Sequence, residues 1–527
     1  MSDFNKMDRK QMERERLARV TAAATIAPMA PAARATVAPA AVPPAPVQRP
    51  PKRNRDVVVI SDTDDDADDH RDASPPPSLS PARKQRKVVV ELPEEKSEPV
   101  APDAKKKYLG GKSLLIGPGD GALKFSDLVD KHHIQAAILS SFVWQEEWLF
   151  PHFPPGIRMC FISNPKSPVQ LLPEMVGHVS NVCPVMPQQQ FGCMHVKLAI
   201  LVYRTFVRVV ISSANLILQD WEMLVNVAHV HDFPKADPTS TTHDTRFWDE
   251  QLLPVLSALS VQPNVTRFLP RFDASSWKGQ LVFSRPGSWL PPASSSSTPG
   301  SAYGLASLAA AARSLGWADI ANTPSTTGGP LPLLDVKYAT SSLGALDKGY
   351  LVSWIAALRG KLAASSKTAT DSSADQFCIV FPTEKEVLDS ELGIMGASSL
   401  WLQKEKWSRP NFPRCAFHRL TSSAPGYMSH AKTMTAMLSQ TLDSPTVEEG
   451  DPIGIYYLGS HNFSLAAWGT VTKQAGKVNM YNYELGIVFP ITDRAQVGHD
   501  FPVPYRPQAI QRYQADDRPW LREEHDM

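Results

Sequence analysis

Cysteine is scarce in this sequence, and its spacing argues against two common classes of site. The 527-residue chain has five cysteines, an odd number, and no two are spaced as C-x-x-C. Structural zinc sites and disulfide frameworks depend on closer and paired spacings. We therefore expect no structural metal and no disulfide framework, and the chain fits a reducing compartment.

Long apolar runs and an N-terminal leader are also missing. The first 19 residues are rich in charge and no apolar run follows them, so the pattern does not predict a signal peptide. No stretch approaches the ~20 continuous apolar residues that a membrane span needs. The sequence therefore predicts neither a leader nor a membrane segment.

Aromatic residues are nearly absent from residues 1–107, where Phe4 stands alone, although this segment holds 15 of the 47 prolines. A segment with so few large apolar side chains cannot offset the conformational entropy of folding. We expect residues 1–107 to be a disordered tail. From Tyr108 onward tryptophans appear and apolar segments alternate with polar ones, which is typical of a mixed α/β fold.

Net charge is close to zero, so global electrostatics do not indicate a partner. The tail holds 20 basic and 17 acidic residues, which leaves 34 basic and 36 acidic residues in the rest of the chain. A nucleic-acid partner would thus require a local basic groove. The tail does contain three basic clusters, at residues 52–55, 83–87 and 105–107, and these favour a nuclear location over the alternative of a merely soluble tail.

Two short β-branched runs in the tail are followed by acidic residues. Val57, Val58, Val59 and Ile60 precede an aspartate run, and a second run begins at Val88. Such a run can add a strand to the open sheet edge of a partner while the acidic residues meet basic ones beside it. The pattern resembles SUMO-interacting motifs, and the alternative is a chance apolar patch in a disordered segment.

One pattern occurs twice and carries the chemistry. H-x-K, an apolar strand, S-x-N and then a tryptophan six residues after the asparagine appear in the same order in both copies. The separation from histidine to asparagine is 20 residues in the first copy and 32 in the second, which a longer hairpin loop explains. The two copies comprise His195, Lys197, Asn215 and Trp221, and His430, Lys432, Asn462 and Trp468.

Two facing copies would gather two imidazoles, two ammonium groups and two amides around one point, because alternate residues of a strand share a face. That set suits phosphoryl transfer. One imidazole can attack phosphorus, and the other can protonate the leaving oxygen and later deprotonate water. The cations and amides can stabilise the equatorial oxygens without a divalent metal or another cofactor. A single H-x-K is common and a strand histidine is more often a core residue, so the duplication carries the argument.

The paired H-x-K motifs resemble those of the phospholipase D superfamily. Its lipases and nucleases have an aspartate five residues after the lysine, where this chain has Val202 and Met437. An asparagine on the next strand is instead typical of tyrosyl-DNA phosphodiesterases, and several flanking segments agree. These segments are Phe191-Gly192, Asn215-Leu216-Ile217, Asp220-Trp221, Ala466-Ala467-Trp468-Gly469 and Tyr483-Glu484-Leu485-Gly486. The resemblance extends from about Gly121 to Trp520.

The resemblance implies a role for each residue of the repeat. His195 would be the nucleophile, and His430 the general acid and then the general base. Both lysines and both asparagines would bind phosphate oxygens. Glu484 would orient the nucleophilic imidazole. The family places a glutamine eleven residues after the first asparagine to orient the second histidine, and here Asn226 occupies that position with a side chain one methylene shorter.

The resemblance also implies substrate contacts. Phe191 and Phe142 would stack on bases, with a place in the core as the alternative for both. Ser341 and Ser342 would hydrogen-bond a backbone phosphate, and Trp520 would lie on the peptide side. His461 replaces the alanine of the usual S-A-N, and would be either a DNA contact or a tolerated substitution.

The sequence therefore predicts an α/β fold with two pseudo-symmetric α/β/α halves, residues 108–270 and 271–527, behind the tail. The implied activity is hydrolysis of a 3′-phosphotyrosyl bond between DNA and a topoisomerase I peptide, or another 3′ adduct, in the nucleus. Two other functions remain open. One is a phospholipase D-like lipase or nuclease, and the other is a non-catalytic, SUMO-dependent DNA-binding scaffold.

Overall fold

The computed structural model describes residues 107–170, 179–187, 192–237, 243–291, 302–324, 328–365, 371–439, 447–473 and 476–525. Nearly all of the predicted tail, with Val57 to Ile60, lies outside these residues, and so does Phe191. All described residues belong to one compact unit.

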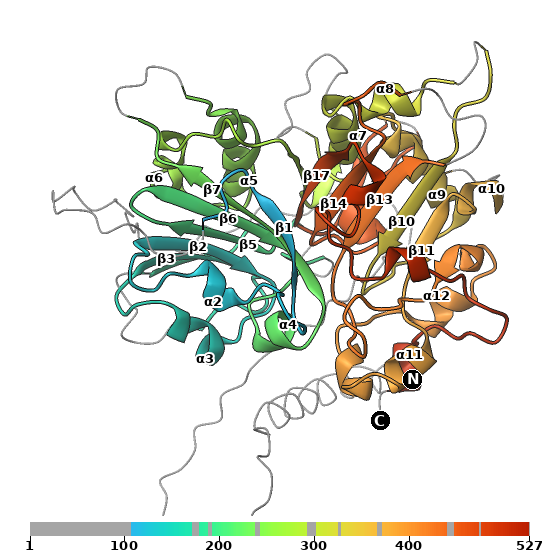
Figure 1. Ribbon diagram of the computed structural model, residues 1–527, viewed down its shortest axis with the longest axis horizontal. Helices are drawn as coiled ribbons and strands as arrows, with labels where there is room; N and C mark the ends of the chain where they lie inside the picture. The colour runs from blue at the N-terminus through green and yellow to red at the C-terminus, as the bar shows by residue number, and fades with distance from the viewer. Residues whose placement is uncertain are drawn as a thin grey trace, which may run out of the picture. The chain divides into compact units, whose positions relative to one another are not determined.

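Two seven-stranded mixed sheets dominate the described residues (Figure 1). In order across the first sheet, the strands are β1 (Lys112–Ile116), β7 (Asn226–Pro234), β6 (Phe206–Ser212), β5 (Leu198–Val202), β2 (Ala136–Ser141), β3 (Arg158–Ser163) and β4 (Val179–Val182). In order across the second sheet, they are β8 (Gln280–Ser284), β17 (Glu484–Ile491), β14 (Gly454–Gly459), β13 (Thr433–Leu438), β10 (Leu334–Ala339), β11 (Phe377–Val380) and β12 (Phe417–His418).

The second sheet repeats the first strand for strand. In each sheet the first four pairings are antiparallel and the last two are parallel. The prediction of two pseudo-symmetric halves with mixed sheets is confirmed. The change from one sheet to the other falls between Pro234, where β7 ends, and Gln280, where β8 begins.

Helices cover both faces of the sheets because the central strands are apolar on both sides. In β2, Leu139 packs with α2 and α4 side chains in one core, whereas Ile138 belongs to the other core, which also contains α5. The helices are α2 (Phe125–Leu128), α3 (Glu146–Leu149), α4 (Leu218–Glu222), η3 (Phe247–Leu252), α5 (Leu253–Ala258), α6 (Pro263–Thr266), α7 (Leu305–Ser314), α8 (Trp317–Ala321), α9 (Lys348–Leu358), α10 (Asp371–Ala374), α11 (Glu384–Leu388), α12 (Lys404–Ser408) and α13 (Leu465–Trp468). No helix among the described residues is long and apolar enough to span a bilayer.

A third, small sheet joins β9 (Gly287–Trp289), β16 (Val478–Met480) and β15 (Thr470–Val471). It bridges parts of the chain that are far apart in sequence, since Val478 pairs with Trp289. The β15–β16 hairpin directly precedes Glu484, so this sheet begins next to the predicted site.

A buried ion pair lies beside Tyr108, near the start of the described residues. Arg208 and Asp232 face each other on β6 and β7, with guanidinium-to-carboxylate distances of 2.7 and 2.9 Å. The same carboxylate accepts the backbone N–H of Tyr108 at 2.6 Å. The Asp232 carboxylate therefore ties Tyr108 to the first sheet. Removing either partner of the ion pair would leave a buried charge uncompensated.

Candidate active site

Both H-x-K segments lie immediately before a strand, at corresponding ends of the two sheets. The carbonyl of Lys197 accepts the N–H of Ser212 at 3.2 Å, and that of Lys432 accepts the N–H of Gly459 at 3.3 Å. Antiparallel pairing therefore brings each H-x-K beside the S-x-N at the end of the next strand, β6 or β14. This geometry agrees with the expectation that the H-x-K and the S-x-N of each copy lie together at one end of a sheet.

The same segments also pair across the boundary between the halves. The backbone N–H of His195 donates to the carbonyl of Tyr483 at 2.9 Å, and that of His430 donates to Val225 at 2.9 Å. Each histidine thus lies at the boundary between the two halves, held by backbone from the opposite half.

A carboxylate from the second half holds His195. Glu484 Oε2 lies 2.8 Å from His195 Nδ1, and both side chains are buried. Glu484 also accepts the Ser460 hydroxyl, and its Oε1 accepts Asn482 Nδ2 at 3.1 Å. Burial alone would raise the pKa of Glu484, but His195 holds that pKa below its usual value. The anion requires a proton on Nδ1, so neutral His195 presents an unprotonated Nε2.

His430 is held in the corresponding way by Asp220, not by Asn226. Asp220 Oδ2 lies 3.0 Å from His430 Nδ1, and the same oxygen accepts the backbone N–H of Asn215 at 2.6 Å. Burial raises the pKa of Asp220, but His430 offsets this and holds the pKa below its usual value. Asp220 belongs to α4 of the first half, so both histidines receive their carboxylate from the opposite half.

The expectation that Asn226 orients His430 is corrected by this geometry. Asn226 Nδ2 donates to the carbonyl of Asp220 at 2.9 Å, and Asn226 Oδ1 accepts the hydroxyl of Ser213 at 2.7 Å. Asn226 begins β7 as Glu484 begins β17, and each accepts a serine hydroxyl from its S-x-N. The Asn226 amide therefore supports the segment that carries Asp220, and the Asp220 carboxylate makes the contact with the His430 imidazole.

Asp220 was missing from the sequence-predicted site, although a signal existed. It lies one residue before the repeated tryptophan, where the second copy has Ala467. A charged residue in a buried layer where the other copy has alanine indicates a specific partner. Asn482 was missed as well, and it connects Glu484 with the backbone N–H of Cys193 at 3.1 Å.

The two lysines are buried beside the histidines. Lys197 Nζ donates to the carbonyl of His195 at 3.0 Å, and Lys432 Nζ donates to that of His430 at 2.7 Å. Each lysine is at most 1% exposed. A buried ammonium group interacts strongly with a nearby anion, because little water screens it. The matching bonds give the two lysines equivalent positions.

The two asparagines differ in their surroundings. Asn462 Oδ1 accepts the hydroxyl of Ser341 at 3.2 Å, so its amide N–H groups point the other way. Asn215 Oδ1 is buried, and no described residue bonds to it. The hydroxyl of Ser141 accepts the backbone N–H of the residue after Asn215, and the hydroxyl of Thr340 accepts that of the residue after Asn462. Ser141 is therefore the counterpart of Thr340. Phe142 therefore occupies the place of Ser341 and supplies no donor, which explains the unpaired oxygen.

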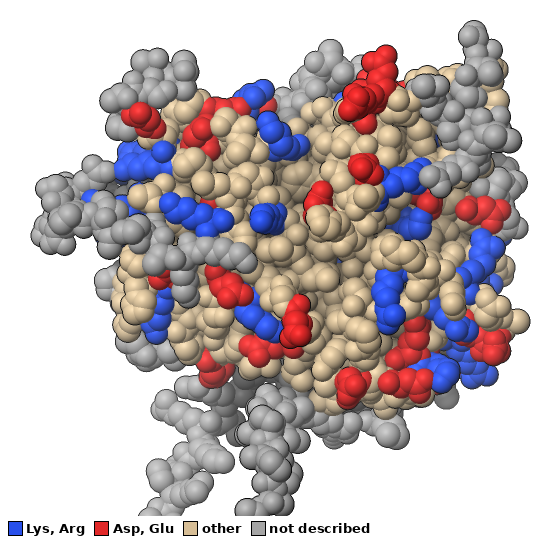
Figure 2. All heavy atoms as spheres, in the orientation of Figure 1, with Lys and Arg blue, Asp and Glu red and all other residues tan. Residues whose placement is uncertain are grey.

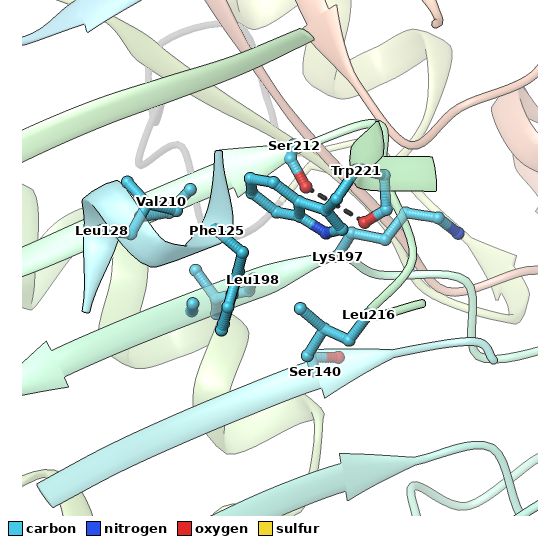
Figure 3. Close-up of a pocket in the computed structure, with 11 residues that line it drawn as sticks. Phe125, Leu128, Ser140, Lys197, Leu198, Val210, Ser212, Leu216 and Trp221 are labelled. Atoms are coloured by element: carbon cyan, nitrogen blue, oxygen red, sulfur yellow. Dashed lines mark hydrogen bonds between the residues drawn. The ribbon is translucent and has the colours of Figure 1, made fainter. Parts of the chain in front are cut away.

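The polar groups of the site lie on a closely packed layer. Behind Lys197, between the sheet and the side chains of Phe125 and Trp221, is a cavity of about 10 Å³ (Figure 3). This space suits at most one water molecule. The layer therefore supports the lysine stem and does not form a substrate pocket. Among the described residues, no three His, Cys, Asp or Glu side chains cluster as metal ligands would.

Comparison with known proteins assigns the family. The family model described as tyrosyl-DNA phosphodiesterase matches residues 118–519. The chain belongs to this family. This confirms the resemblance drawn from the two motifs, and the matched range contains both H-x-K copies with Asp220 and Glu484.

Two relatives named as tyrosyl-DNA phosphodiesterases have low sequence identity to this chain. The Arabidopsis thaliana protein "Tyrosyl-DNA phosphodiesterase 1" is 27% identical over 315 residues, which are 57% of this chain and 47% of that protein. The chain thus matches about half the length of this relative. A "Probable tyrosyl-DNA phosphodiesterase" of Caenorhabditis elegans is 24% identical over 385 residues, 69% of this chain and 78% of that protein. The yeast tyrosyl-DNA phosphodiesterase crystal structure has the same fold, with a TM-score of 0.58, 17% identity, and coverage of 78% of this chain and all of that one.

Several substrate contacts that the family resemblance implied do not fit the observed burial. Phe142 is fully buried with its ring edge-on to His195 at 5.4 Å, so it packs against the imidazole and cannot stack on a base. Ser341 and Ser342 are fully buried, and Ser341 is bonded to Asn462. In the described residues, Phe142 thus packs against the His195 ring and Ser341 holds the Asn462 amide.

His461 is a core residue rather than a DNA contact. Its Nδ1 lies 2.7 Å from the Tyr457 hydroxyl and its Nε2 lies 3.0 Å from Ser284 Oγ. Ser284 donates its only hydroxyl proton to the carbonyl of Ala467, so it must accept from Nε2–H of His461. Burial lowers the pKa of His461 to about 3. The histidine is therefore neutral and locked behind the active-site layer.

Trp520 also differs from its expected role on the peptide side. The indole is 3% exposed and stacks on His525 with ring centroids 3.9 Å apart. Both faces are therefore unavailable to a peptide in this conformation. The predicted stacking of Phe191 concerns a residue outside those that the structure describes.

Proposed function

We propose that the protein hydrolyses the 3′-phosphodiester that joins DNA to a tyrosine, such as one from a topoisomerase I peptide, and other 3′ adducts. The observation that carries this proposal is the pair of buried imidazoles, each bonded through Nδ1 to a carboxylate of the opposite half. Because Nδ1 of each ring contacts a carboxylate, Nε2 is the nitrogen that would carry the chemistry at one phosphorus atom.

In the first step, Nε2 of His195 attacks phosphorus and the bond from phosphorus to the tyrosine oxygen breaks. His430 donates its Nε2 proton to the departing phenolate. The product is DNA bound to His195 through a phosphoramide. In the second step, His430 removes a proton from water, the resulting hydroxide attacks phosphorus, and the bond to His195 breaks. DNA with a 3′-phosphate is released and both histidines return to their starting states.

The assignment of these roles is supported by the hydrogen bonds of the two carboxylates. Glu484 receives two hydrogen bonds besides that of His195, whereas Asp220 receives one besides that of His430. Each additional donor makes a carboxylate a weaker base. Fewer donors thus hold the Asp220 carboxylate than the Glu484 carboxylate. This difference suits His430 as the acid and His195 as the neutral nucleophile.

Lys197, Lys432, Asn215 and Asn462 would bind the nonbridging phosphate oxygens. Their charges and N–H groups are already in place before the reaction, so little reorganisation is needed as negative charge builds on those oxygens. This arrangement supplies charge stabilisation from the protein itself, and the proposed reaction therefore includes no metal ion or cofactor.

The function is tested by incubating the protein with an oligonucleotide that carries a 3′-phosphotyrosine, with and without EDTA. We expect release of a 3′-phosphate product at an unchanged rate in EDTA, because the two imidazoles and two lysines carry the chemistry. His195→Ala is the matched inactive control. Cleavage of phosphatidylcholine instead would indicate a lipase. Binding without cleavage would indicate a scaffold, and loss of activity in EDTA with recovery in magnesium would overturn the mechanism.

We also propose nuclear action and SUMO binding through the tail. The basic clusters support the first, and the run from Val57 to Ile60 with its acidic flank supports the second. Replacing Val57, Val58, Val59 and Ile60 with alanine is expected to abolish SUMO binding, measured by calorimetry, while cleavage stays unchanged because no proposed site residue lies in the tail. Undiminished binding after a further replacement of Val88 to Val90 would contradict the proposal.

A further inference from the structure

The small sheet of β9, β16 and β15 carries basic side chains and no acidic ones. Residues 285–291 and 470–483 contain Arg285, Lys473 and Lys477, without a single Asp or Glu. On the face seen in Figure 2, by contrast, basic and acidic side chains are interspersed and form no broad field of one sign. The cations of this sheet are thus a local feature that neighbouring acids on the same segments do not neutralise.

This sheet begins directly beside the proposed nucleophile. Strand β8 ends at Ser284, which pairs with Glu484, the residue that holds His195, and Arg285 follows. On the other side, a Cβ on Gly192 would lie only 2.0 Å from the carbonyl of Tyr481. The chain that leads into the first H-x-K therefore lies against the segment that leaves β16.

Aromatic and cationic groups are stacked on the sheet. The guanidinium of Arg285 lies 4.7 Å from the centre of the Trp289 ring, which is half-buried, and the Tyr303 ring packs on Trp289 in a T-shaped arrangement with centroids 5.0 Å apart. Lys473 is exposed and Lys477 is half-buried. A flat cation on an indole, with further ammonium groups nearby, combines a stacking surface with positive charge, which is the combination that single-stranded nucleic acid requires.

We propose that this sheet binds the DNA strand that leads away from the scissile phosphate. The inference rests on the proposed function and adds the path of the substrate. Lys473 and Lys477 contact backbone phosphates, and the Arg285–Trp289 stack supports a nucleobase. DNA fits better than the peptide, because every nucleotide carries the same negative charge, whereas a peptide offers no fixed charge for three cations to meet.

The test compares two substrates in Lys473→Ala/Lys477→Ala and in the unaltered protein. One substrate is a 3′-phosphotyrosyl oligonucleotide long enough to cross the sheet. The other is a single nucleotide with a 3′-p-nitrophenyl phosphodiester, which ends at the scissile phosphate. We expect the ratio of kcat/KM for the long over the short substrate to fall about tenfold in the variant. The slope of log kcat/KM against log salt for the long substrate should become shallower by about 1.4, or ~0.7 for each lost phosphate contact.

Lys112→Ala/Lys131→Ala removes the same charge elsewhere and serves as the control. Lys112 begins β1 opposite Val230, and Lys131 precedes β2, so both lie at the end of the first sheet away from the strand ends that form the site. An unchanged ratio in Lys473→Ala/Lys477→Ala, an equal loss in the control, or a loss that depends on peptide length would overturn the inference. If the unaltered protein cleaves neither substrate, the proposed function itself fails.

Discussion

Replacing His430 with alanine is expected to accumulate DNA covalently attached to the protein. The leaving group of the first step is a tyrosine phenol with a pKa of about 10, which departs with little help from an acid. Water in the second step is a poor nucleophile without a base. We therefore expect His430→Ala to slow the second step by about 10²–10⁴-fold, and the first step by less.

The adduct is measured as a shifted band of labelled substrate on a denaturing gel. The phosphoramide bond makes the band labile to acid. His195→Ala and the double variant are expected to give no band, because the attacking nitrogen is gone. A band in His195→Ala would make His430 the nucleophile. Product release by His430→Ala without any band would contradict the proposed order of roles. His461 is not expected to substitute, because both of its nitrogens are bonded within the core.

Asp220→Asn is expected to lower turnover by about 10²–10⁴-fold, the contribution that a correctly protonated general acid–base makes. An amide at this position can donate to Nδ1 of His430 and stabilise the wrong tautomer. The imidazolium also loses its anion, so the protonated form disappears at lower pH. The alkaline limb of the rate–pH profile should therefore move to lower pH.

Two further variants separate positioning from folding. Glu222→Gln changes a carboxylate on the same helix that makes no contact with His430, and it should leave the profile unchanged. Asn226→Gln in the Asp220→Asn background restores a side chain of the length that the family uses, and we expect it to recover part of the turnover. A fall in thermal stability without movement of the profile would show that Asp220 only supports the fold.

The crossed carboxylates make the two halves interdependent. Glu484 comes from the second half and holds His195, while Asp220 comes from the first half and holds His430. Bonds between backbone groups cross the same boundary at Tyr483 and Val225. Each half therefore contains a histidine that only the other half can orient, and the site forms only where the halves meet.

The sequence by itself determined the family, the duplicated architecture and the eight residues of the repeated motif. These features depend on local order along the chain, because a strand, a turn and the next strand bring an H-x-K beside its S-x-N whatever the rest does. The repeat also places Asp220 opposite Ala467, whereas the correspondence of Phe142 with Ser341 comes from hydrogen bonds in the structure.

Only the tertiary structure decided which groups contact the histidines and which side chains are buried. Asp220 and His430 are 210 residues apart in the chain, and no spacing rule relates them. Whether Phe142, His461 or Trp520 reaches solvent depends on the layers that pack over it from other parts of the chain. A motif determines the local strand pairing of its own segment, whereas burial and contacts between the halves depend on the whole fold.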